Sequence, residues 1–176
     1  MLRRAYRTDV SLVSGGKAAC AVVYPSESSD WRGLAEQVAG AIKALGADEV
    51  VMVSDTEAVP KRLGPLREDL EKKSLILLGD LNTNRALFAF YASYYTCCDG
   101  RYPGGAGYEL RTVVRPFGRD ANCLIIGGSS KEGCAAGVAR FVERLKSLRR
   151  GRTVYLPYLL EVRLGDELRE LLAPAI

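Results

Sequence analysis

Histidine is absent from the 176 residues of this sequence. Its absence excludes the Ser-His-Asp and Cys-His catalytic arrangements and every histidine-ligated metal site. Carboxylates, Lys, Tyr and Cys can still act as acids, bases or nucleophiles, so catalysis is disfavoured rather than excluded. No spacing of acidic residues points to the facing carboxylate pair of a glycosidase. We therefore predict no catalytic residue, no cofactor and no metal site in this chain.

Cysteine is scarce and unpatterned. The five cysteines include no C-x-x-C pair, which argues against both a disulfide framework and a zinc knuckle. Cys20 and Cys123 fall in predicted strands and Cys134 on a predicted helix, where cysteine behaves as a small buried hydrophobe. The adjacent pair Cys97-Cys98 has no such setting, and its role stays open.

Long apolar runs and a strong charge imbalance are also missing. No run approaches the ~20 apolar residues of a membrane helix, so we predict no membrane partner. The segment Met1–Tyr6 lacks the apolar stretch of a signal peptide, which would place a full-length chain in the cytoplasm and otherwise leaves the localisation unknown. The net charge is only +4, and the densest basic cluster (Lys146, Arg149, Arg150, Arg152) falls at the end of a predicted helix. There cations meet the negative end of the helix dipole, so we predict no nucleic-acid partner.

The sequence does contain two matching strand–glycine–turn–helix units. They are Leu75–Arg85 and Cys123–Gly133, and a strand-like segment, Gly107–Val113, lies between them. Each unit is an apolar run too short for a helix, followed by glycine, capping residues and a helical pattern. This order predicts an α/β fold with α+β character: a mixed β-sheet of about five to seven strands with helices packed on it. We place one α/β domain at 1–150 and a C-terminal extension, or lead-in to a further domain, at 151–176.

The remaining patterns predict the individual elements. Ser14-Gly15-Gly16 favours a hairpin turn, and the strand 108–116 is expected to pair antiparallel with the strand 123–126. Strands are predicted at 9–13, 17–24, 50–53, 75–78, 108–116, 123–126, 153–156 and 159–164, and helices at 31–45, 66–72, 83–95, 132–148 and 166–172. Asp30 is expected to cap the first helix, and 101–107 reads as a loop.

The second glycine turn resembles a phosphate cradle at first sight. Residues Gly127–Gly133 precede a helix, and helix N-termini attract anions. However, the turn lacks both the G-K-[S/T] of a P-loop and the G-x-G-x-x-G of a dinucleotide site. We favour a sharp turn in which Ser129 or Ser130 caps the helix, while an anion or ligand site including Lys131 remains the alternative.

Polar and aromatic residues elsewhere give further weak binding candidates. An Asn or Thr of Asn82-Thr83-Asn84 is expected to cap the helix that follows the first glycine turn, with Arg85 as an exposed first-turn residue. The alternative is that Asn82, Asn84 and Arg85 line a polar cleft beside Ser129. Arg111 and Glu109 are two residues apart in a predicted strand and so share one face of it, where they are expected to form a solvent-facing ion pair. Trp31 and Tyr102 are candidates for an exposed sugar-stacking platform, whereas Phe88, Tyr91 and Tyr95 share a helix face and are expected in the core. The candidate set is therefore Asn82, Asn84, Arg85, Tyr102, Arg111, Ser129 and Lys131.

Several motifs in order resemble a known kind of domain. They are "Ser-Leu-Val-Ser-Gly-Gly-Lys-Ala" with "Ala-Val-Val-Tyr", "Leu-Ala-Glu-Gln-Val-Ala-Gly-Ala-Ile", Gly79 followed by "Asn-Thr-Asn", and "Gly-Tyr-Glu-Leu-Arg-Thr-Val" followed by "Leu-Ile-Ile-Gly-Gly-Ser-Ser-Lys-Glu-Gly". Over roughly residues 9–147 the chain is similar to the small α/β domain that precedes the catalytic domain of several carbohydrate-active enzymes. That domain is found ahead of α-glucuronidase and β-hexosaminidase barrels and in heparinase II/III-like polysaccharide lyases.

The resemblance implies a non-catalytic accessory domain of a larger glycoside hydrolase or polysaccharide lyase. Its expected partner is a catalytic domain of the same polypeptide or a second subunit, with a possible contact to carbohydrate. The family's catalytic residues belong to the domain that follows, so none is transferred to this chain. The alternative is a stand-alone protein or enzyme that binds an anion, nucleotide or sugar at the turns of Gly79 and Gly127-Gly128. That alternative predicts that both turns converge on one pocket.

Overall fold

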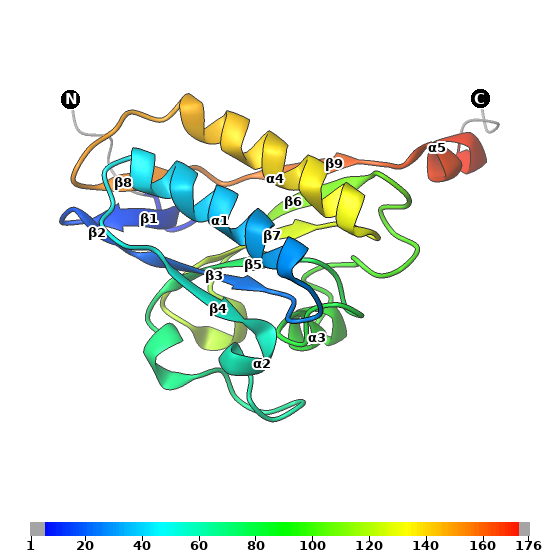
Figure 1. The fold of residues 1–176 in the computed structure, drawn as a ribbon, viewed down its shortest axis with the longest axis horizontal. Coiled ribbons are helices and arrows are strands. Elements are labelled where there is room, and N and C mark those ends of the chain that lie inside the picture. Colours follow the sequence, from blue (N-terminus) through cyan, green and yellow to red (C-terminus); the bar gives the residue numbers. More distant parts are fainter. Residues whose placement is uncertain (1–5, 173–176) are drawn as a thin grey trace.

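The computed structural model describes residues 6–172, so most of the segment that bears on a signal peptide (residues 1–5) lies outside the described residues. As predicted, the fold is mixed α/β. A six-stranded sheet and a three-stranded sheet carry five α-helices within the described residues. Figure 1 shows the main sheet as a middle layer with helices above and below it.

The main sheet has the strand order β4-β3-β5-β7-β6-β9. Its members are β3 (Cys20–Tyr24), β4 (Val51–Ser54), β5 (Ser74–Leu78), β6 (Tyr108–Val113), β7 (Cys123–Gly127) and β9 (Leu160–Arg163). The first four strands in this order are parallel, whereas β6 runs antiparallel to both β7 and β9. The predicted antiparallel pairing of β6 and β7 is confirmed, with Glu109 opposite Gly127 and Val113 opposite Cys123.

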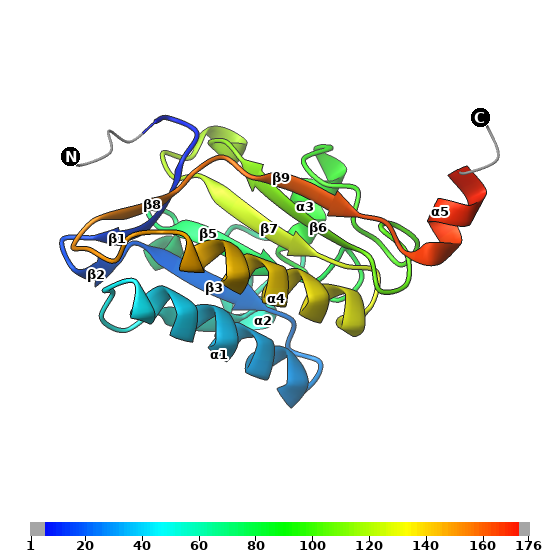
Figure 2. The same ribbon diagram turned by 90° about the horizontal axis from the view of Figure 1, so that it is seen from above.

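Two long helices cover one face of this sheet. These are α1 (Ser29–Ala44) and α4 (Lys131–Lys146), which lie side by side in Figures 1 and 2. The predicted inward residues Val138, Phe141 and Leu145 are buried against the strands. Gly137 brings α4 close to the sheet, because a Cβ there would meet Ile126 Cγ2 at 3.1 Å.

Short elements cover the opposite face: α2 (Asp55–Ala58), a 3₁₀ turn at Glu68–Leu70 and α3 (Leu87–Ala92). The predicted helices here are wrong in extent. Residues 83–86 form a turn rather than a first helical turn, and 66–72 supplies only the 3₁₀ turn. Helix α2 was not predicted, although Ser54 and Glu57 form the reciprocal capping box that the sequence S-x-x-E signals.

The small sheet has the order β2-β1-β8, made of β1 (Val10–Ser14), β2 (Lys17–Ala18) and β8 (Val154–Leu156). The predicted single strand 17–24 is therefore split. The Ala19 N–H donates to Leu12 O in the small sheet, whereas Ala19 O accepts from Ser74 N in the main sheet. The chain changes sheets at this residue, which leaves the hairpin turn at Ser14–Gly16 as predicted.

The segment assigned to a C-terminal extension folds onto the same body. It adds β8 to the small sheet and β9 to the edge of the main sheet, and α5 (Asp166–Leu172) follows. In Figure 1, α5 follows the end of β9 and lies at the opposite end of the molecule from the small sheet.

Candidate functional site

Most of the predicted site residues lie at the carboxyl edge of the parallel strands. The chain passes from β3 to β4 through α1 on one face and from β4 to β5 through α2 on the other, so the direction of winding reverses between β3 and β5. In open α/β sheets ligands bind in the crevice outside such a reversal point. The loops after β3, β4 and β5 are therefore the place to look for a site.

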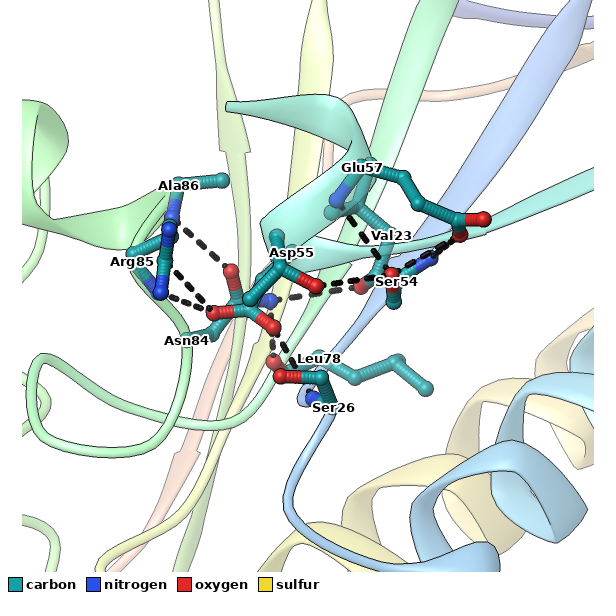
Figure 3. Close-up of polar contacts among 10 residues, drawn as sticks. Val23, Ser26, Ser54, Asp55, Glu57, Leu78, Asn84, Arg85 and Ala86 are labelled. Carbon is teal, nitrogen blue, oxygen red and sulfur yellow. Dashed lines mark hydrogen bonds and ion pairs between the residues drawn. The ribbon is translucent and has the colours of Figure 1, made fainter. Parts of the chain in front are cut away.

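Asp55 closes this crevice from the end of β4. Its side chain accepts hydrogen bonds from Ser26 N–H (Oδ1, 2.9 Å) and from Arg85 N–H (Oδ2, 2.9 Å), and the Arg85 guanidinium lies 3.6 Å from Oδ2. Figure 3 shows the carboxylate between the loop after β3 and the loop after β5. Asp55 is only 4% exposed, so its charge ties three loops together instead of facing a ligand.

Asn84 fills the space between the same strand ends. It is fully buried, and its amide nitrogen donates to Leu78 O (2.8 Å) at the end of β5 and to Val23 O (3.4 Å) in β3 (Figure 3). Its amide oxygen accepts from Ala86 N–H at 3.0 Å. All the groups of this amide that could recognise a sugar or an anion are thus used by the backbone.

Asp80 organises the turn that carries Asn82. One carboxylate oxygen accepts from Asn82 N–H (2.9 Å), Thr83 N–H (2.9 Å) and the Thr83 hydroxyl (2.8 Å). The expectation that Asn82, Thr83 or Asn84 caps the next helix is wrong, because α3 begins later and has no side-chain cap. In the turn itself Asp80 supplies the acceptor. Asn82 itself remains exposed.

A second buried carboxylate, Glu109, gathers Tyr102 and Arg111. Arg111 donates through Nε (2.8 Å) and Nη2 (3.1 Å), and Glu109 also accepts from the Thr96 hydroxyl (3.0 Å) and the Tyr102 hydroxyl (3.3 Å). The predicted ion pair is present, but its solvent-facing position is wrong because Glu109 is fully buried. The loop that carries Thr96 and Tyr102 covers this part of the sheet.

The titratable neighbours of Glu109 have raised pKa values. Burial, followed by the charge of Glu109, raises the pKa of Tyr102 to about 12, and burial and Glu109 also raise the pKa of the Cys98 thiol. The hydrogen bonds to Glu109 raise the pKa of Arg111. These groups keep their protons, which suits a structural network better than proton transfer.

The N-terminus of α4 is covered by the glycine-rich loop that precedes β6. Ser130 caps the helix by accepting from Gly133 N–H (3.0 Å), as predicted, and its hydroxyl donates to Gly105 O (2.9 Å). Ser129 Oγ accepts from Gly104 N–H at 2.8 Å. Lys131 pairs with Asp30 at 2.5 Å, and Asp30 lies within α1 rather than capping it, since Ser28 holds that position.

The candidate residues therefore form separate groups along one edge. Arg85 and Asn84 belong to the Asp55 group, Tyr102 and Arg111 to the Glu109 group, and Ser129 and Lys131 flank the N-terminus of α4. The two glycine turns do lie at neighbouring strand ends, because β5 and β7 pair directly. However, the loop 103–107 is hydrogen-bonded across the second turn, to Ser129 and Ser130.

The aromatic candidates change roles. Trp31 is 4% exposed and packs in the core, so it offers no stacking platform. Phe88, which was expected in the core, is exposed, and Phe90 is buried instead. Sequence reasoning missed the buried acceptors Asp55 and Asp80. Their signal was available, since each is an acidic residue within two positions of the end of a strand.

Within residues 6–172 no three Cys, Asp or Glu side chains are grouped as a metal ion would require. In the same residues no helix has both the length and the apolar character needed to cross a bilayer. No family model matches the chain, and no curated protein is similar to it in sequence.

Proposed function

We propose that this chain is a non-catalytic accessory α/β domain of a larger polysaccharide-processing enzyme, a glycoside hydrolase or a polysaccharide lyase. It packs against the catalytic domain through strand β9. The observation that carries the proposal is the apolar face of β9, where Leu160 is 52% exposed and Val162 is 40% exposed. The motif order described for residues 9–147 supports the kind of parent enzyme.

The geometry of β9 suits a docking surface. Leu160 and Val162 stand opposite Arg111 and Glu109 of β6, so they share the sheet face that α1 and α4 do not cover. On the other face Glu161 binds Arg140 and Arg144 of α4, which holds the strand in place. With Tyr158, also half exposed, these side chains form what we call the β9 surface.

The closed carboxyl edge supports the non-catalytic part of the proposal. The crevice in which an α/β enzyme binds its substrate is here filled by Asp55 and Asn84, whose side chains bind the chain's own backbone. A covalent neighbour that contributes the active site is consistent with a domain whose own crevice is filled.

The first experiment is to read the gene beyond the codon for Ile176. A frame that continues into a barrel or a helical toroid supports an accessory domain, and a frame without any catalytic domain on either side refutes it.

Where a catalytic domain follows, the two parts are produced separately and mixed. We expect the double variant Leu160→Asp/Val162→Asp to weaken their association at least tenfold in calorimetry, because two charges replace the apolar contacts. Leu63→Asp is the matched control, since Leu63 is 68% exposed in the loop after α2, away from β9. Equal loss in the control would refute the assignment of the β9 surface.

A further inference from the structure

The opposite edge of the main sheet carries an open groove of about 1280 Å³. It lies at the amino ends of β5 and β7, bordered by the small sheet, the 3₁₀ turn after α2 and the loop between β6 and β7. Its lining includes Ser11 and Ser14 of β1, Tyr155 of β8, Lys72 and Lys73 before β5, and Phe117 to Asn122. None of the binding-site residues predicted from the sequence is among the residues that line this groove.

The loop between β6 and β7 is held in a strained conformation at this groove. Arg115 (φ 46°) and Phe117 (φ 56°) are both left-handed without being glycine, a backbone conformation that is strained for either side chain. Asn122 compensates by accepting from Arg115 N–H at 2.9 Å and by donating to Arg7 O and Asp9 O. Strain of this kind gathers at ligand clamps and active sites more than in ordinary connections.

The strained conformation presents an aromatic ring to the groove. Phe117 rests edge-on against Phe90 and Tyr95, with ring centroids 5.1 Å and 5.3 Å away, yet it remains 49% exposed. A ring fixed on one side and open on the other is suited to stacking on a flat, partly apolar ligand such as the face of a sugar.

Arg119 lines the groove and carries an unsatisfied buried donor. Its Nη2 donates to Leu70 O (2.9 Å) and Lys73 O (2.8 Å), whereas its buried Nε has no hydrogen-bond partner, the one such side-chain atom within residues 6–172. A buried donor without a partner destabilises the folded state.

The charges around the groove favour an anion. Asp69 and Asp120 are neutralised by Arg67 and Arg115. When these two arginines are included, Lys and Arg outnumber Asp and Glu by six to four. Lys72 and Lys73 form no ion pair within the described part of the chain.

We propose that this groove binds an anionic oligosaccharide, with carboxylate groups at Lys72 and Lys73, hydroxyl groups at the polar wall and one sugar face on Phe117. The inference rests on the proposed function, because it is a glycan-processing enzyme that would need a second glycan contact outside its catalytic domain. The groove and the β9 surface lie on different parts of the sheet, so the two proposals can fail separately.

The test is a titration of the purified chain with tetragalacturonate, followed by NMR and calorimetry, with cellotetraose as the neutral probe of equal length. We expect at least tenfold tighter binding of the anionic probe and a loss of affinity with added salt. Equal affinity for the two probes, or binding to neither, would overturn the proposal. Preferential binding of a single-stranded RNA of matched charge would overturn it as well.

Two variants place the binding in the groove. Lys72→Ala/Lys73→Ala should weaken binding of tetragalacturonate at least tenfold, whereas Lys43→Ala/Lys61→Ala removes the same charge elsewhere and should change it less than twofold. Phe117→Asn keeps a residue that tolerates the left-handed backbone and removes the ring, so it should weaken binding at least fivefold. Thermal melting of each variant verifies that it is folded. Equal loss of binding in both lysine pairs would mean that only net charge is recognised and would refute the site.

These results are distinguishable from those for the β9 surface. A chain that docks on its catalytic domain but does not bind tetragalacturonate refutes the groove and leaves the accessory role standing. A gene that encodes no catalytic domain refutes the accessory role, whatever the chain binds.

Discussion

Replacing Glu161 by glutamine tests how strand β9 is held on the sheet. The carboxylate receives Arg140 Nε at 2.6 Å, Arg144 Nη2 at 2.6 Å and the Tyr108 hydroxyl at 2.9 Å. These hydrogen bonds, that of Arg140 first, lower the pKa of Glu161 from 4.5 to about 2. A depression of this size corresponds to about 3 kcal/mol if solvent is ignored.

Solvent reduces that figure. The Glu161 side chain is 21% exposed, but those of Arg140 and Arg144 are 37% and 46% exposed, so water and salt screen the pair. We expect Glu161→Gln to lower the free energy of unfolding by about 1–2 kcal/mol near neutral pH. For a chain of this length each kcal/mol lowers the melting temperature by roughly 2–4 °C.

The sign of the pH dependence follows from the lowered pKa. Stability from Glu161 is fully present above its unfolded pKa of about 4.5 and is lost as the pH falls through its folded pKa of about 2. At about pH 3 less than half of it should remain. Urea unfolding of the protein and the variant at about pH 7 and pH 3 measures the difference directly.

The control is Glu143→Gln, which breaks the exposed pair of Glu143 with Lys146 on α4 and should cost at most about 0.5 kcal/mol. If Glu161→Gln costs no more than this control, or if its cost is the same at both pH values, the ion-pair network does not hold β9 in place.

Two further predictions concern buried groups. Asp55→Ala leaves the N–H groups of Ser26 and Arg85 without their acceptor, so urea unfolding should show a loss of about 1–3 kcal/mol in the free energy of unfolding. The control Glu36→Ala, which removes an exposed ion pair on a helix, should cost under about 0.5 kcal/mol. Similar losses in the two variants would show that Asp55 does not hold the loops. Iodoacetamide should label only the exposed Cys97 in the folded protein and all five cysteines in denaturant. The reason is that burial raises the pKa of each of the other four thiols, to about 12 in Cys20 and Cys134. Mass spectrometry that finds a second cysteine labelled at an equal rate would contradict this burial.

The regular elements of the main sheet could be predicted because their signals are local. Short apolar runs ending at glycine specify β5 and β7, and the short interval before β7 specifies its antiparallel pairing with β6. Ser130 was recognisable as a cap for the same reason, since its partner Gly133 is three residues away. Such features depend on neighbours in the sequence and not on the rest of the fold.

The errors arise where distant segments compete for the same backbone. Residues 83–86 have a helical pattern, but hydrogen bonds from Asn84 to two strands hold them in a turn. Residues 17–24 have one strand pattern, but Ala19 joins two sheets. Tertiary contacts of this kind override local propensity, and no spacing in one sequence reports them.

The candidate site divides in the same way. The sequence by itself placed Asn82, Asn84, Arg85, Ser129 and Lys131 in the turns that follow two strands, because those signals are local, but it did not identify Asp55 or Asp80. Only the tertiary structure decided that Asp55, Asn84 and Glu109 are buried and satisfied by the protein's own groups, which closes that edge. It alone also created the groove at the opposite edge, because segments as far apart as Ser11, Lys73, Phe117 and Tyr155 meet only when both sheets are assembled.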